Sequence, residues 1–209
     1  MIGLVIGRRR QGKSTLAFSL AKQTGGGIVI YDPAGQYRRF LVVHNAKELD
    51  FAIHDKQSTI VYQPESADIQ GEFAVVADQM WDWVGFTFLI DEAWQVQTAY
   101  KPDAMLEVWL HKMDMEQTSL IMTVHRPRDV STLARSVATD WYIFRSTHPR
   151  DLDVIEEQCG PQVREAVSQL PLHHYVHYHT DTEAFEIVSQ PATWYEPLRA
   201  EDAHARSRV

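Results

Sequence analysis

A polar loop with a glycine at each side is the feature that most restricts how this chain can fold. The loop reads Gly7, Arg8, Arg9, Arg10, Gln11, Gly12, Lys13, Ser14 and Thr15. The apolar segment Ile2–Ile6 precedes it, and apolar residues at helical spacing predict a helix over Ser14–Thr24 after it. A strand, a glycine loop and a helix in direct succession are typical of the first unit of a parallel α/β sheet.

The same alternation continues along the chain. Continuous apolar runs predict further strands that are buried on both faces of a sheet, and helical periodicity predicts two more helices. The strand runs are Ile28–Tyr31, Thr59–Tyr62, Thr87–Ile90, Leu120–Val124 and Trp141–Phe144; the helices are Glu72–Val84 and Ala104–Gln117. Near the C-terminus, Leu172–His179 and Ala184–Val188 flank a turn and predict an antiparallel hairpin. We therefore predict an α/β fold with a mainly parallel sheet, helices on both faces and a C-terminal hairpin.

Length and composition favour one domain. The 209 residues suit a single domain over 1–195, followed by a polar tail over 196–209. We expect no transmembrane segment and no signal peptide, because no apolar run approaches the ~20 residues that cross a bilayer. Cys159 is the only cysteine, which fits a cytoplasmic setting. The net charge of −8 excludes non-specific binding of nucleic acid over the whole surface, so any such contact must be local.

The loop matches the P-loop pattern at every fixed position, and this predicts a site for ATP. Gly7 and Gly12 let the backbone turn its N–H groups toward phosphates, and the following helix adds positive potential at its start. Lys13 would place its ammonium on the β- and γ-phosphates, and Ser14 would give its hydroxyl to Mg²⁺. The arginines at positions 8–10 occupy variable positions, where contact with phosphate or base and simple solvation are both open.

A strand that ends in two acids predicts the second half of this site. The run Phe86–Ile90 leads directly into Asp91 and Glu92. We assign Asp91 to Mg²⁺ and Glu92 to the attacking water, as its base. Because the carboxyl ends of parallel strands share one sheet edge, these acids, His125 and the glycine loop should meet there.

Two further segments resemble the FtsK–HerA superfamily of P-loop ATPases. Residues 28–37 read Ile-Val-Ile-Tyr-Asp-Pro-Ala-Gly-Gln-Tyr, similar to its second-strand motif, and residues 120–130 are similar to its fourth-strand segment. The resemblance spans roughly residues 2–160. It implies a RecA-like core, a hexameric ring with ATP between subunits, and transport of DNA or peptides. Under it, Lys13, Glu92 and His125 are catalytic, with His125 in place of the usual sensor glutamine.

The expected partners follow from the same resemblance. Small members without additional domains resemble genome-packaging ATPases of tailless, membrane-containing viruses, which implies double-stranded DNA, a capsid vertex or membrane protein, and a location in host cytoplasm or virion. The arginine that members carry before the fourth strand is not matched. Lys112 stands in that stretch, with Arg126, Arg128 and Arg145 as other candidates.

Other interpretations stay open from sequence alone. A P-loop kinase for a small acceptor would need an arginine-bearing lid, for which the sequence offers no candidate. A phage assembly or switch protein would use ATP to change partners. The histidines at 173, 174, 177 and 179 suggest a metal site at first, and strand alternation puts three of them, 173, 177 and 179, on one face. Without an acidic or cysteine partner in view, we interpret them as an edge-strand surface.

Overall fold

The structure is a computed structural model that describes residues 1–189 except 82, 99–101, 103 and 113–117. A nine-stranded sheet runs through it in the order β3-β4-β2-β5-β6-β1-β7-β8-β9. The strands from β3 to β7 are parallel, whereas β8 and β9 are antiparallel to their neighbours. The predicted α/β class and C-terminal hairpin are confirmed. The predicted tail over 196–209 lies outside the described residues.

The strands fall where the apolar runs predict them. Their bounds are β1 (Ile2–Ile6), β2 (Gly27–Tyr31), β3 (Leu41–Val43), β4 (Thr59–Tyr62), β5 (Phe86–Ile90), β6 (Ser119–Val124), β7 (Asp140–Phe144), β8 (His174–His179) and β9 (Ala184–Ser189). Every residue of β1 and β7 is buried, as continuous apolar runs lead one to expect of strands covered on both faces. Among the described strands, only β3, a short edge strand of three residues, was not predicted.

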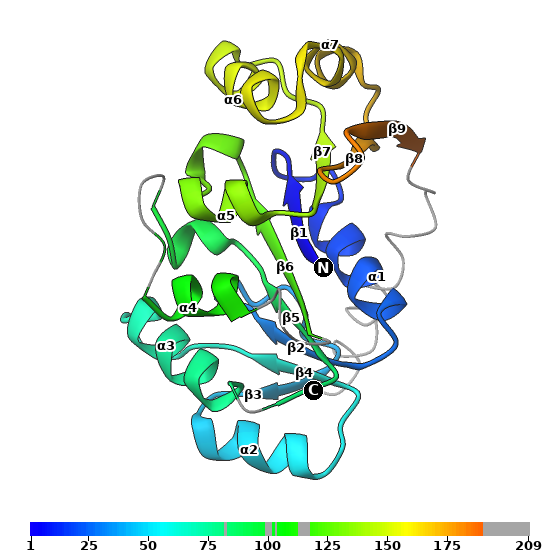
Figure 1. The fold of residues 1–209 in the computed structure, drawn as a ribbon. Helices are drawn as coiled ribbons and strands as arrows, with labels where there is room; N and C mark the ends of the chain where they lie inside the picture. The colour runs from blue at the N-terminus through cyan, green and yellow to red at the C-terminus, as the bar shows by residue number, and fades with distance from the viewer. Residues whose placement is uncertain (82, 99–101, 103, 113–117, 190–209) are drawn as a thin grey trace, which may run out of the picture.

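Helices cover both faces of the sheet (Figure 1). They are α1 (Lys13–Gln23), α2 (Ala46–His54), α3 (Ile69–Gln79), α4 (Ala104–Lys112), α5 (Thr132–Val137), α6 (Pro149–Cys159) and α7 (Pro161–Gln169), with 3-10 turns at Ala93–Gln95 and Pro127–Asp129. One apolar core lies between α1 and the sheet. The other core contains side chains of α2 to α7 together with strand residues. The two layers bury all but the first residue of β2, β5 and β6, and so fix the strand ends that carry the polar residues.

Two helix boundaries differ from the prediction. The helix expected over Glu72–Val84 is α3, which begins at Ile69 because the side chain of Asp68 accepts a hydrogen bond from the backbone N–H of Gly71 (3.0 Å). It ends at Gln79, and Val84 is 67% exposed, so including Val84 in the apolar stripe was wrong. The helix expected over Ala104–Gln117 is described as far as Lys112; the rest of it lies outside the described residues.

The position of β6 in the sheet governs the site. It pairs with β1 on one side and with β5 on the other, so it separates the strand that leads into the glycine loop from the strand that leads into the acid pair. The residue that follows β6 therefore lies between the loop and the acids. That residue is His125.

Candidate functional site

The glycine loop is held in shape by its own glutamine. The Gln11 side-chain oxygen accepts a hydrogen bond from the Arg8 backbone N–H (2.5 Å), and its amide donates to the Arg145 carbonyl at the end of β7 (3.0 Å). A Cβ on Gly7 would lie 2.7 Å from the Cβ of Phe144, so no larger residue fits there. Gly12 has φ 102°, a conformation that favours glycine. The loop therefore requires both of the glycines that the pattern requires.

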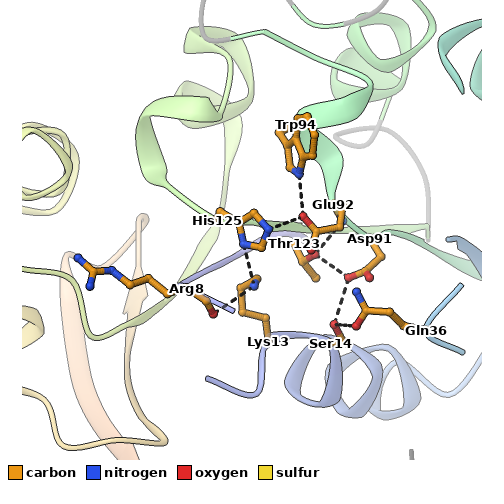
Figure 2. A network of polar contacts seen from close by, with 9 residues as sticks. All are labelled: Arg8, Lys13, Ser14, Gln36, Asp91, Glu92, Trp94, Thr123 and His125. Carbon is orange, nitrogen blue, oxygen red and sulfur yellow. Dashed lines mark hydrogen bonds and ion pairs between the residues drawn. The ribbon is translucent and has the colours of Figure 1, made fainter. Parts of the chain in front are cut away.

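Lys13 begins α1 and turns its side chain back under the loop. The residue is only 6% exposed, and its ammonium donates to the Arg8 carbonyl (3.3 Å). The same ammonium lies 3.2 Å from Nδ1 of His125 (Figure 2). Burial lowers the pKa of Lys13, and the carboxylates of Glu92 and Asp91 oppose that shift. The loop thus carries a desolvated cation at the start of a helix, which is a favourable position for an anionic ligand.

His125 bridges this cation and an acid. Its Nε2 atom lies 2.8 Å from Oε2 of Glu92. A lysine ammonium has only hydrogen atoms to offer, so Nδ1 of His125 must be the acceptor and the ring proton must lie on Nε2, facing Glu92. Burial, and then the nearby Lys13 ammonium, lower the pKa of His125, which keeps the ring neutral as this arrangement requires. Lys13 therefore donates to His125, and the other ring nitrogen of His125 lies close to the Glu92 carboxylate without the geometry of a hydrogen bond.

Glu92 is fixed by more than the histidine. The indole N–H of Trp94 donates to its Oε2 atom (2.7 Å), and its backbone N–H donates to Oγ1 of Thr123 (3.0 Å). Its backbone has φ 54° and ψ 46°, a left-handed conformation that costs about 1–3 kcal/mol for a residue with a side chain. This turn sends Glu92 toward His125 while Asp91 continues from β5 toward α1 (Figure 2). The two acids therefore have different surroundings.

Asp91 faces the hydroxyl of Ser14. Its Oδ1 atom accepts a hydrogen bond from Thr123 (2.6 Å) and lies 3.4 Å from Oγ of Ser14. Its Oδ2 atom is buried and has no hydrogen-bond donor among the described residues. Burial raises the pKa of Asp91 to about 7, with further upward contributions from Asp32 and Glu92. A divalent cation beside Ser14 would give the Asp91 carboxylate the partner that its Oδ2 atom lacks and would favour the ionised form of the carboxyl group. The residues present therefore fit Mg²⁺, which prefers oxygen ligands.

The loop after β2 adds residues that sequence analysis did not assign to the site. The Gln36 side chain accepts a hydrogen bond from the Ser14 hydroxyl (3.0 Å), and the Tyr37 hydroxyl donates to the Ser14 carbonyl (3.2 Å). Asp32 positions this loop by accepting from the Tyr37 backbone N–H (2.9 Å). Thr123 and Trp94 are also unpredicted. Thr123 is the second-last residue of β6, and its place beside the carboxyl end of a predicted strand is the signal by which the sequence could have indicated it. The sequence offers no comparable signal for Trp94.

An open cleft of about 880 Å³ lies over these groups, lined by Arg9, Arg10, Gly12, Lys13, Ser14, Thr15, Ala34, Gln36, Glu92, Trp94, Gln95 and His173. A second cavity of about 440 Å³ adjoins it, and Gly7, Arg8, Arg9, Arg126 and Arg145 are among its lining residues. The predicted binding residues thus divide between two cavities. The Arg8 side chain extends away from Lys13 (Figure 2), and its Nη2 atom donates to Oγ1 of Thr147 (3.3 Å). Gln11 is buried and lines neither cavity.

The candidates for a trans-acting cation come from several different elements. Arg126 and Arg145 line the smaller cavity, while Nε of Arg128 lies 3.7 Å from Oδ1 of Asp151. Lys112 is the last residue of α4. Among the described helices, none is long and apolar enough to cross a membrane.

Comparison with solved structures reveals a shared fold. The genome packaging NTPase B204 from Sulfolobus turreted icosahedral virus 2, in complex with ATP-gammaS, superposes with a TM-score of 0.73 at 19% identity, over 91% of this chain and 96% of that one. This chain has the fold of that packaging NTPase. VirB4 of Thermoanaerobacter pseudethanolicus has a TM-score of 0.69 at 9% identity, over 94% of this chain and 90% of the other. No family model matches the sequence, and no curated protein sequence matches it.

The structure therefore supports the resemblance that the sequence predicts at the level of the fold. A weaker similarity extends to the N-terminal domain of zonular occludens toxin from Neisseria meningitidis, with a TM-score of 0.51 at 13% identity, over 93% of this chain and 96% of that one. These neighbours share the overall fold of this chain.

Proposed function

We propose that this chain is an ATP-hydrolysing motor that translocates double-stranded DNA and packages a viral genome into a capsid. The observation that carries the proposal is the series Lys13–His125–Glu92 beside the Ser14–Asp91 pair, at the carboxyl edge of the sheet. A cation, a polar relay and a carboxylate at one edge are what hydrolysis of a triphosphate requires. The fold shared with a packaging NTPase supports the choice of polymer.

In this mechanism ATP enters the larger cleft and its β- and γ-phosphates attract the Lys13 ammonium. Lys13 then exchanges its contacts with the Arg8 carbonyl and His125 for phosphate oxygens. Ser14 and Asp91 would hold Mg²⁺, which supplies charge neutralisation for the phosphates. Backbone N–H groups of the loop other than that of Arg8, which donates to Gln11, bind the remaining phosphate oxygens.

Glu92 then accepts a proton from a water molecule. The water oxygen bonds to the γ-phosphorus, the bond from that phosphorus to the bridging oxygen of ADP breaks, and phosphate and ADP leave. In this proposal His125 positions Glu92 by close contact, because its Nε2 atom lies 2.8 Å from Oε2 of Glu92. Because Lys13 moves when ATP binds, the same histidine links occupancy of the phosphate site to the position of the base.

Motion along DNA requires more than one copy in this proposal. We propose a homo-oligomeric ring, a hexamer, with ATP between subunits and with arginines of the smaller cavity beside the neighbouring site. The net charge of −8 means that DNA contacts are confined to basic segments such as pore loops. A capsid vertex or membrane protein would anchor the ring, in the host cytoplasm or in the virion.

The test is the rate of ATP turnover with and without duplex DNA, in samples whose particle mass is measured at the same time. The proposal predicts an oligomer whose turnover rises with DNA, and no turnover in a Lys13→Ala control. A DNA-indifferent monomer that phosphorylates an added acceptor would favour the kinase. Nucleotide binding without turnover, coupled to a change of protein partner, would favour the switch protein. Either result would overturn the motor.

A further inference from the structure

Side chains that can bind a metal gather at the other end of the sheet, on its last three strands. Asp140 begins β7 and is directly opposite His179 of β8, while His177 is directly opposite Glu186 of β9. Opposite residues of antiparallel strands share a face, and residues two apart on one strand share it as well. The four side chains therefore lie on one face, although they come from three separate segments of sequence.

The donor atoms converge closely. Oδ1 of Asp140 lies 3.0 Å from Nε2 of His177 and 2.9 Å from Nδ1 of His179. One ligand atom from each of these three residues lies within 4.8 Å of the others. Zinc is ~2.0–2.2 Å from nitrogen and carboxylate ligands, so a small outward movement of these atoms accommodates the ion. The side chains of Asp140 and His177 are 13% and 14% exposed, and that of His179 is 48% exposed, which leaves an entry path.

Neighbouring groups hold the three side chains in orientations suited to an ion. Nδ1 of His177 lies 3.5 Å from a carboxylate oxygen of Glu186, which leaves Nε2 to face Asp140. The Thr139 hydroxyl donates to the second oxygen of Asp140 (2.7 Å), and the ring of Tyr142 stacks on His177 at 4.3 Å. A histidine ligand whose other nitrogen faces a carboxylate, and a carboxylate ligand that is itself hydrogen-bonded, are regular features around bound metals.

We propose that Asp140, His177 and His179 bind a divalent first-row transition metal ion, with Zn²⁺ the best match to two imidazoles and one carboxylate. Glu186 and Thr139 act as positioning residues for His177 and Asp140. Sequence analysis set the histidines aside because no acid was in view; the acid comes from β7, 37 residues before His177. His173, expected on the same face, precedes β8 and lies 3.3 Å from the Gln11 carbonyl instead.

The role of the ion is structural. Asp140 lies at the start of β7, whereas the glycine loop is held from the end of that strand. An ion bound by Asp140 and two residues of β8 joins the C-terminal hairpin to the parallel sheet, across the junction where the strand direction reverses. This inference does not depend on the proposed function, because it involves neither ATP nor DNA.

The test is titration of Zn²⁺ into the metal-free full chain without nucleotide, followed by calorimetry, with metal content measured after gel filtration. We expect one retained Zn²⁺ per chain and a higher Tm. His179→Gln and Asp140→Asn should weaken binding by at least ~10-fold and remove the rise in Tm. His174→Gln is the matched control, because His174 belongs to β8 but alternates to its opposite face. Asp91→Asn should also leave binding unchanged.

Circular dichroism in a chelator verifies that each variant is folded. Loss of Zn²⁺ binding in a folded His179→Gln variant is sufficient to support the site, whatever the fold of Asp140→Asn. The His179 side chain is half exposed, so its replacement disturbs little packing. The proposal is overturned if the wild-type chain retains no Zn²⁺, because the contacts are then only polar contacts between a carboxylate and two imidazoles. It is also overturned if His179→Gln and Asp140→Asn bind Zn²⁺ as the wild type does, or if Asp91→Asn alone loses it.

Discussion

The Nε2 atom of His125 lies 2.8 Å from Oε2 of Glu92, so the histidine directly contacts the carboxylate that we propose as base. The ring also accepts a hydrogen bond from Lys13 through Nδ1 (3.2 Å). Because His125 contacts both Lys13 and Glu92, we expect its loss to lower the rate of ATP turnover more than the affinity for ATP.

Replacing His125 tests this relationship. His125→Ala should lower kcat about 100-fold, which is the scale of losing one positioned polar group in a catalytic site, while ATP affinity changes little. His125→Gln should retain more activity, because its amide can accept from Lys13 and donate to Glu92 at once. Steady-state turnover and equilibrium ATP binding measure the two effects. Equal kcat in wild type and His125→Ala would remove His125 from the mechanism.

Removing the loop lysine should affect binding itself. Lys13→Ala should weaken ATP binding by about 1.5–3 kcal/mol, the usual contribution of a hydrogen bond to a charged group. Lys22→Ala is the matched control, because Lys22 lies on the same helix but is exposed near its other end. Calorimetric titration with an ATP analogue measures both. Intact affinity in Lys13→Ala would contradict the assignment of the phosphate site.

The first loop glycine should tolerate no side chain. A Cβ at Gly7 would lie 2.5 Å from Oε1 of Gln11 and 2.7 Å from Cβ of Phe144. Gly7→Ala should lower the free energy of unfolding by about 1–3 kcal/mol and weaken ATP binding, because the loop must shift. In the control Gly3→Ala, the nearest atom is 3.7 Å away, an ordinary contact. Chemical denaturation of both variants checks the expectation, and equal stability of the two would refute it.

The single cysteine should be unreactive in the folded chain. Burial raises the pKa of Cys159 to about 12, so its reactive thiolate is scarce below that pH. The fold favours the neutral thiol, so this contribution to stability is complete below the unfolded pKa of about 8.5 and declines as the pH rises toward the folded value. Thiol-specific labelling at pH 8 should be slow in buffer and fast in guanidinium chloride. Fast labelling of the native chain would show an accessible Cys159.

The fold was largely predictable because its strands are buried on both faces and therefore read as continuous apolar runs. Four helices, α2, α5, α6 and α7, were missed. For α2 a signal was present in the sequence, because Asn45 caps the helix by accepting from the Glu48 backbone N–H (3.1 Å). The contact between Lys13 and His125 depends on β6 lying between β1 and β5. Strand order of this kind cannot be deduced from local hydrophobic periodicity. The approach of Asp140 to His177 depends in the same way on pairing of distant strands.

The most direct test of the account is ATP turnover by Glu92→Gln, measured together with its ATP affinity. Glutamine keeps the shape of Glu92 but cannot take the proton of the attacking water. We predict unchanged ATP binding and a kcat lower by about 100- to 10,000-fold, the range for loss of a general base. Steady-state hydrolysis equal to that of the wild type would contradict the central claim that Glu92 activates water at this site.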